Sequence, residues 1–213
     1  MNVQRALLTL AISASLLGSA TSSTAATTAP KENADQFIER VNREMREDYR
    51  EMTAAEWLSS TYINEDSQLV SSKANERGLA KLGKYAEQAR AYEGQPMSPA
   101  TARSLQLLRL GITVPPPKNP ASLAELTRIG AKLNGDYGAG KYCPDKGNAS
   151  TCLDIGKIED ILADTKGKSY EEQLDAWQGW HTISVPMRQG YQRFVELNNE
   201  GARDQGFGNT GEL

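Results

Sequence analysis

The only histidine of the 213-residue chain ends the segment DAWQGWH, which also holds two of the three tryptophans. His181 lies four residues after Trp177 and directly after Trp180. An imidazole can donate a hydrogen bond to an anion, bind a metal or move a proton. A lone histidine beside tryptophan can equally be a packing residue. The segment therefore predicts either a binding group or an aromatic cluster, and the sequence leaves both open.

A cysteine pair, Cys143 and Cys152, forms the second group of reactive residues, with eight residues between the two thiols. Pro144, Gly147 and Asn148 favour a tight loop in that interval. In an oxidising compartment the pair is most simply a local disulfide, and two free buried thiols are the alternative. Two thiolates and one distant histidine do not complete a tetrahedral metal site, so a cysteine metal centre is the least favoured interpretation.

Several other kinds of chemistry are excluded by the sequence. A single histidine cannot form the His-Glu-x-x-His motif of a zinc helix, and no Gly-x-Ser-x-Gly motif is present. The stretch GDYGAGK lacks the spacing of a phosphate-binding loop. A net charge of −3 provides no broad basic face, so we expect no nucleic-acid partner. No catalytic residue and no metal ligand can be assigned to the chain.

The N-terminal segment has the pattern of a secretory signal. Arg5 precedes an apolar stretch from Ala6 to about Gly18, and small residues that suit cleavage follow. We therefore expect a signal peptide over residues 1–25, a disordered linker over 26–32, and an exported chain that is periplasmic or secreted. The apolar stretch is too short to span a bilayer comfortably, so no membrane partner is expected after cleavage.

Apolar residues recur at helical spacing through the remaining chain, and no convincing strand pattern is present, so we expect an all-α fold. Candidate N-terminal caps are Asn33, Ser98, Ser122 and Ser169. The prolines of VPPPKNP predict a rigid, extended connector. The expected helices begin near residues 34, 68, 99, 123, 156, 170 and 186.

Three blocks in the C-terminal part resemble the peptidyl-dipeptidase A family, the angiotensin-converting-enzyme-like zinc metallopeptidases. YCPDKGNASTCL is similar to the small disulfide loop of that family. YEEQLDAWQGWH and YQRFVELNNEGARDQGFGNTGE are similar to the two blocks that follow it, in the same order and spacing. Further upstream, AAEWLSSTYI loosely matches the first lid helix of the family.

The resemblance implies a fold and an activity. Long antiparallel lid helices would be followed by helices of one half of a deep-cleft metallopeptidase, over residues 33–213. The activity would be release of C-terminal dipeptides from oligopeptides by a zinc-activated water. In the family the zinc helix lies beyond the last matching block. The expectation is therefore an N-terminal part of such an enzyme, without Zn²⁺ ligands and inactive alone.

The resemblance also implies roles for single residues. Cys143 and Cys152 would form the disulfide of the family, and His181 would contribute to a chloride site with Trp177 and Trp180 around it. Trp57 would face the cleft from the lid, although its place on an apolar helical line favours core packing. The alternative function is a non-catalytic, secreted helical module that binds peptides or a partner chain.

Overall fold

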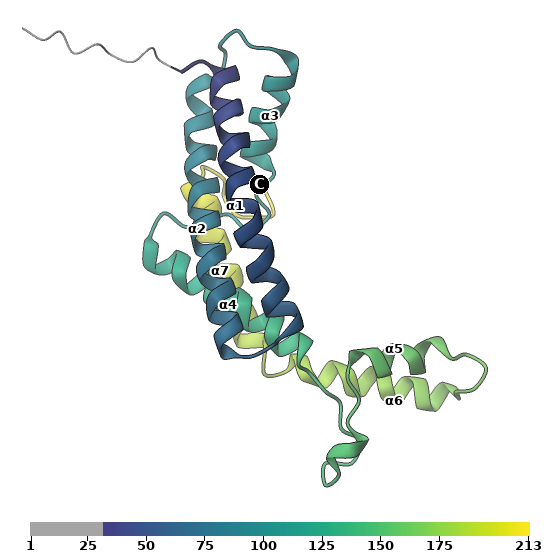
Figure 1. Cartoon of the computed structure of the whole chain (residues 1–213). Helices are drawn as coiled ribbons and strands as arrows, with labels where there is room; N and C mark the ends of the chain where they lie inside the picture. The colour runs from purple at the N-terminus through teal and green to yellow at the C-terminus, as the bar shows by residue number, and fades with distance from the viewer. Residues whose placement is uncertain (1–31) are drawn as a thin grey trace, which may run out of the picture. The chain divides into compact units, whose positions relative to one another are not determined.

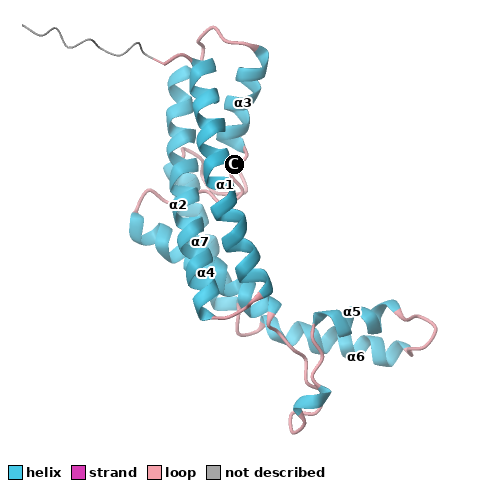
Figure 2. Ribbon diagram, viewed as in Figure 1, coloured by secondary structure: helices cyan, strands magenta, loops and turns pink. Residues whose placement is uncertain are grey.

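Seven α-helices and three short 3₁₀ turns make up most of residues 32–213, the part described by the structure, which is a computed structural model. Figure 1 labels the helices and Figure 2 shows the loops between them. Within the described residues there is no strand, and Tyr142 and Leu153 form an isolated antiparallel bridge. The all-α prediction is confirmed. The expected signal peptide and most of the expected linker lie outside the described residues.

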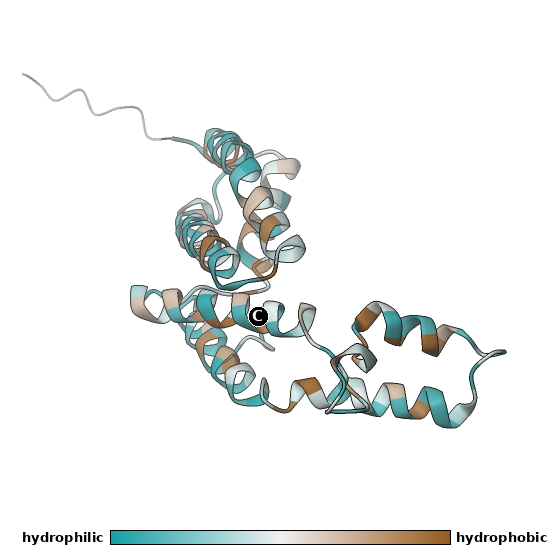
Figure 3. Cartoon of the chain, turned by 60° about the horizontal axis from the view of Figure 1, so that its bottom comes forward, coloured by the Kyte–Doolittle hydropathy of each residue, from teal (hydrophilic) through white to brown (hydrophobic). Residues whose placement is uncertain are grey.

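The first three helices build one hydrophobic core. Helix α1 (Ala34–Thr61) lies antiparallel to α2 (Glu65–Ala89), and α3 (Pro99–Leu110) packs against both. Each helix alternates hydrophilic and hydrophobic segments, as Figure 3 shows, because only one stripe faces its neighbours. The buried side chains that meet between these helices are Ala34, Phe37, Ile38, Val41, Tyr85, Ala89 and Leu105.

The caps explain where the helices begin. Asn33 and Gln36 form the predicted capping box, and Ser98 accepts a hydrogen bond from the backbone N–H of Thr101 as expected. Helix α2 begins at residue 65 rather than 68, because Asn64 forms a further capping box with Ser67.

One predicted cap is wrong, and one helix begins slightly later than expected. Helix α4 (Pro120–Gly138) is capped by Asn119 and not by Ser122, since a proline at the first helical position favours an earlier start. Helix α7 (Arg188–Asp204) was expected from about Pro186 and begins two residues later, because turns occupy the chain between residues 182 and 187.

Helices α4 and α7 form a second core with the proline connector. Leu126, Ile129 and Leu197 are buried there, and Val114 packs against them. The connector is itself buried at residues 115–117. Helix α7 passes so close that a Cβ atom at Gly201 would overlap the carbonyl oxygen of Pro115. The connector is therefore a packed structural element.

Helices α5 (Ile155–Ala163) and α6 (Tyr170–His181) form a helical hairpin with a third core. Ile158, Ala176 and Trp180 are its buried residues. Gln173 of α6 donates to the carbonyl oxygens of Ile161 and Asp164, both at 3.3 Å, and so satisfies the C-terminal end of α5. None of the helices between residues 32 and 213 combines the length and apolar character needed to cross a bilayer.

Candidate functional site

Helix α6 positions the histidine and both tryptophans. Its start is fixed by a capping box, in which Ser169 and Glu172 each accept a hydrogen bond from the backbone N–H of the other. The hydrogen bond from the Ser169 backbone lowers the pKa of the Glu172 carboxyl, with a further contribution from Lys168. The helical period then places Trp177 and His181 on one exposed face, whereas Trp180 is only 8% exposed.

Trp177 and His181 form a local pair. Their ring centroids lie 4.2 Å apart at 40°, and the Nδ1 atom of His181 lies 2.6 Å from the carbonyl oxygen of Trp177. A carbonyl oxygen only accepts, so Nδ1 must carry the proton of this hydrogen bond. In the neutral ring Nε2 is then an acceptor. An anion could therefore receive a hydrogen bond from Nε2 only when the ring is protonated.

Trp180 belongs to the interior of the site. Its ring makes an edge-to-face contact with Tyr137 of α4, with centroids 5.7 Å apart. The preceding Gly179 lies directly under the ring of Tyr142, whose hydroxyl donates to the two oxygens of Asp175 at 3.0 and 3.1 Å. Burial raises the pKa of the Tyr142 hydroxyl, and the neighbouring carboxylate raises it further.

A groove of about 1130 Å³ brings the three predicted residues of α6 together with residues from three other helices. Its lining is mainly apolar, with Glu159 and Arg188 as charged side chains and His181 as an imidazole. Sequence reasoning missed the parts from α4 and α7, because no local pattern joins residues that are distant along the chain. The apolar and aromatic lining includes Leu133, Tyr137, Ile158, Leu162, Trp177, Trp180, Val185, Met187, Tyr191 and Phe194.

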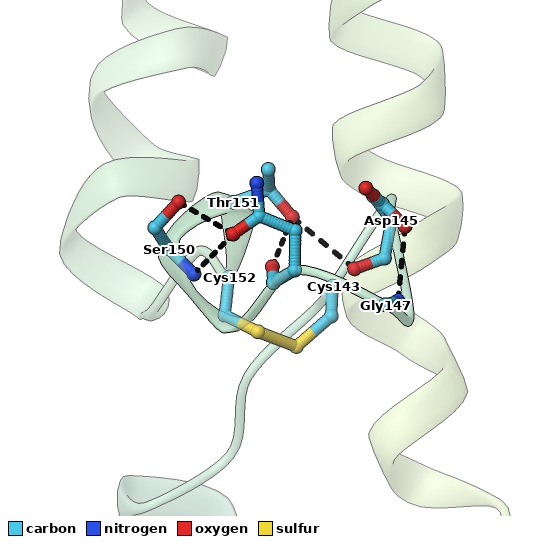
Figure 4. Close-up of a disulfide and its surroundings, with 7 residues drawn as sticks. Cys143, Asp145, Gly147, Ser150, Thr151 and Cys152 are labelled. Atoms are coloured by element: carbon cyan, nitrogen blue, oxygen red, sulfur yellow. Dashed lines mark hydrogen bonds between the residues drawn. A yellow bond between two sulfur atoms is a disulfide. The ribbon is translucent and has the colours of Figure 1, made fainter.

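The predicted disulfide between Cys143 and Cys152 is present, with the Cα atoms 4.1 Å apart. Figure 4 shows the loop that it closes. Inside the loop the Asp145 carboxylate accepts from the backbone N–H of Gly147 at 2.9 Å. The hydroxyl of Thr151 donates to the carbonyl oxygen of Asp145 at 3.3 Å. The alternatives of free thiols or a cysteine metal site are thereby excluded.

Trp57 occupies the exposed side of α1. Its side chain is 73% exposed, so the expectation of core packing is wrong. The buried residue nearby is Ala55. The step of two positions from Ala55 to Trp57 turns the side chain by about 200° around the helix axis. Trp57 therefore points away from the face that Ala55 buries.

The donor set of the described residues does not fit a zinc ion. Within residues 32–213 no three His, Cys, Asp or Glu side chains are arranged to hold a metal. Both cysteines are oxidised, and one ring nitrogen of the single histidine is bonded to a backbone carbonyl.

These observations define a class of protein, a helical fold with a small disulfide loop and an aromatic groove. The family model described as "Angiotensin-converting enzyme", peptidase family M2, matches residues 28–213. The chain therefore belongs to the angiotensin-converting enzyme family, a family of zinc metallopeptidases.

Individual relatives agree with this assignment. The chain is 29% identical to the angiotensin-converting enzyme of Rattus norvegicus over 166 residues, which are 75% of the chain and 12% of the rat protein. It is 26% identical to that of Sus scrofa over 189 residues, 86% of the chain and 14% of the pig protein. A 77-residue match to the Oryctolagus cuniculus enzyme reaches 40% identity, over 35% of the chain and 6% of the rabbit protein. The chain thus spans a small part of the length of these relatives.

Proposed function

We propose that this chain forms the lid-bearing helical part of a zinc-dependent peptidyl dipeptidase, which releases C-terminal dipeptides from oligopeptides. The family match over residues 28–213 carries the proposal. The antiparallel α1–α2 pair and the disulfide loop support it, because both were expected from the resemblance to that family. The signal-like N-terminus supports export to the periplasm or the medium.

The zinc chemistry of the family has no ligands among the described residues, so we assign no catalytic step to them. Their part in the proposed activity is to provide helices around the substrate and the aromatic groove beside His181. By this proposal the 213 residues alone bind no stoichiometric zinc and release no dipeptide.

The test is a measurement of zinc and activity on two samples. The first is the purified 213-residue chain, and the second is the native gene product from the exported fraction of its source cells. We expect substoichiometric zinc and no dipeptide release from the first sample, by elemental analysis and mass spectrometry of a peptide digest. One bound zinc with dipeptide release by the 213-residue chain would contradict the assignment.

The intact mass and N-terminus of the native product separate the two functions. A species several times heavier than 23.2 kDa that binds one zinc and releases dipeptides supports the peptidase. A zinc-free species close to that mass, less a signal peptide, supports the alternative of a non-catalytic binding module. The groove with its exposed aromatic side chains is the observation that favours this second function.

We also propose a chloride role for His181, which rests on the family resemblance. The bond from Nδ1 to the Trp177 carbonyl means that only the protonated ring could bind the anion through Nε2. A chloride effect on the native enzyme should therefore disappear in His181→Gln, which removes that donor. A chloride effect of equal size in that variant would leave His181 as a packing residue.

A further inference from the structure

The outward face of α1 carries a line of arginines that ends at an exposed tryptophan. Arg43, Arg46, Arg50 and Trp57 follow one another at intervals of three, four and seven residues, which places them on one side of the helix. All four are exposed, and Tyr49 beside them is 68% exposed. We call these four residues the arginine face.

Three acidic residues of α1 point away from the arginine face, toward α2. The Asp48 carboxylate accepts from Lys81 at 2.5 Å, and Glu51 pairs with Arg77. A third carboxylate, that of Glu44, accepts from the Tyr85 hydroxyl. These three carboxylates are therefore engaged at the α2 contact, whereas the arginines and the exposed Glu39 lie on the outer side of the helix.

The arginines themselves form no salt bridge within residues 32–213. Glu39 and Glu47 lie on adjoining positions of the helix without pairing to them. Arg46 and Arg50 are a like-charged pair one turn apart, an arrangement that destabilises a helix by about 0.2–0.5 kcal/mol. Glu39 and Glu47, each four residues from Arg43, offset this repulsion by a similar amount. The face is a candidate for binding a partner because its three guanidinium groups are exposed and form no salt bridge among the described residues.

We propose that the arginine face binds an acidic polypeptide segment of a partner protein. Carboxylates of the segment would pair with the three arginines, and an apolar or aromatic side chain would pack on Trp57. Fourteen residues of helix between Arg43 and Trp57 span about 21 Å, the length of about six residues of extended chain. This surface goes beyond the proposed peptidase activity and does not depend on it.

Charge complementarity and the aromatic end favour a protein segment over a lipid surface. Recognition of anionic lipids typically uses about four to eight clustered cations, and this face holds three. Trp57 and Tyr49 offer aromatic contact area, which is enriched where proteins bind proteins. Arginine also pairs with carboxylates in a bidentate geometry that lysine cannot match.

The test measures fluorescence anisotropy of a labelled twelve-residue peptide of Glu, Asp, Leu and Phe, with the full chain at low salt. The triple variant Arg43→Gln/Arg46→Gln/Arg50→Gln should bind about tenfold more weakly, since three exposed ion pairs contribute about twofold each. Trp57→Ala should weaken binding as well. The matched control is Arg103→Gln/Arg128→Gln/Arg203→Gln, which removes the same charge from exposed arginines elsewhere and should bind like the parent chain.

Three results would overturn the proposal. They are equal binding by the arginine-face triple variant, equal loss in the control triple variant, and equal binding of a peptide with Gln and Asn in place of its acids. A further outcome is that the chain binds vesicles with anionic lipid through the same arginines but does not bind the acidic peptide. The ligand of the arginine face would then be a membrane surface and not a protein segment. The arginine-face variant should also unfold at about the temperature of the parent chain, because it removes like-charge repulsion and opposite-charge attraction of similar size. A lower unfolding temperature would assign the arginines a structural role instead.

Discussion

Gly201 is the residue at which α7 and the proline connector come closest. A methyl group at that position would overlap the Pro115 carbonyl oxygen, which is backbone and cannot rotate away. We therefore expect Gly201→Ala to destabilise the fold by about 1–3 kcal/mol, the range of overpacked sites, despite the higher helix propensity of alanine. Urea unfolding followed by circular dichroism measures this difference.

Gly190, in the first turn of the same helix, is the matched control. A Cβ atom there would meet Leu133 at an ordinary distance of 3.6 Å. Gly190→Ala should leave stability unchanged or raise it by up to about 1 kcal/mol. If both alanine variants were equally stable, close packing at Gly201 would not be what the position requires.

The two tryptophans of α6 differ in burial, and their removal should differ in cost. Trp180 is almost fully buried, so Trp180→Ala should lower the free energy of unfolding by about 3–5 kcal/mol. Trp177 is 51% exposed, and Trp177→Ala should lower it by clearly less. Chemical unfolding of both variants provides the comparison, and similar losses would contradict the assignment of Trp180 to the core.

At the scale of helices, the α1–α2 contact contains an acid-sensitive hydrogen bond. The bond from the Tyr85 hydroxyl, together with Arg40, holds the pKa of the Glu44 carboxyl below its ordinary value of 4.5. Burial is the main cause that raises the pKa of Tyr85 to about 12, so the hydroxyl remains a donor through acid and neutral pH.

The lowered pKa of Glu44 determines how this residue affects the stability of the fold as the pH changes. A carboxyl whose pKa is lower in the folded state than in the unfolded state stabilises the fold at pH values above its unfolded-state pKa. This stabilisation is lost as the pH falls through its folded-state pKa. Thermal unfolding should therefore show a loss of stability below about pH 4.5 that is smaller in Glu44→Gln. Glu47→Gln, at an exposed residue of the same helix that forms no ion pair within residues 32–213, is the matched control. If Glu44→Gln lost stability with falling pH as steeply as the parent chain, Glu44 would not be a source of the acid sensitivity.

The disulfide loop should stabilise the α5–α6 hairpin in particular. Cys143 and Cys152 are nine positions apart, for which the chain-entropy account gives about 2.5 kcal/mol. The loop base, Tyr142 and Leu153, packs against the hairpin core. In a Cys143→Ala/Cys152→Ala variant, amide hydrogen exchange should accelerate in α6 and much less in α1. Uniform acceleration along the chain would show that the loop supports the whole fold.

Short sequence patterns, such as caps and helical periodicity, predicted the helices well. They did not predict contacts between residues that are distant in sequence. Each capping box joins two residues that are three positions apart, Asn33 with Gln36 and Ser169 with Glu172. Both were predicted, and both are confirmed. The cap at Ser122 failed because Asn119, followed by proline, was a competing local signal. Exposure of Trp57 depends on which side of α1 receives α2, and the groove depends on α4 meeting α6. Neither relation is encoded in a short stretch of sequence.

For the molecule as a whole, the open groove predicts self-association of the isolated chain. Trp177, Val185 and Tyr191 are exposed along it, and contiguous apolar surface of this kind promotes association. Light scattering should show a mass that rises with concentration. Val185→Lys/Tyr191→Lys should reduce that rise, whereas Leu69→Lys/Val70→Lys, at exposed apolar residues of α2, should not. A strictly monomeric parent chain would contradict the prediction.

The cores differ in how much of the chain must exist before they can close. The first uses residues from Ala34 to Leu108, whereas the second needs both Val114 and Leu197. At 5–20 residues per second, the ribosome delivers the intervening 89 residues in roughly 5–20 seconds. Helix α4 follows within the first 30 of those residues, and until it packs, the side of α2 that receives it presents Gln68, Ser71, Asn75 and Leu79. Three of these four side chains carry amide or hydroxyl groups that water can hydrate, so the surface that α2 exposes before α4 packs on it is mainly polar.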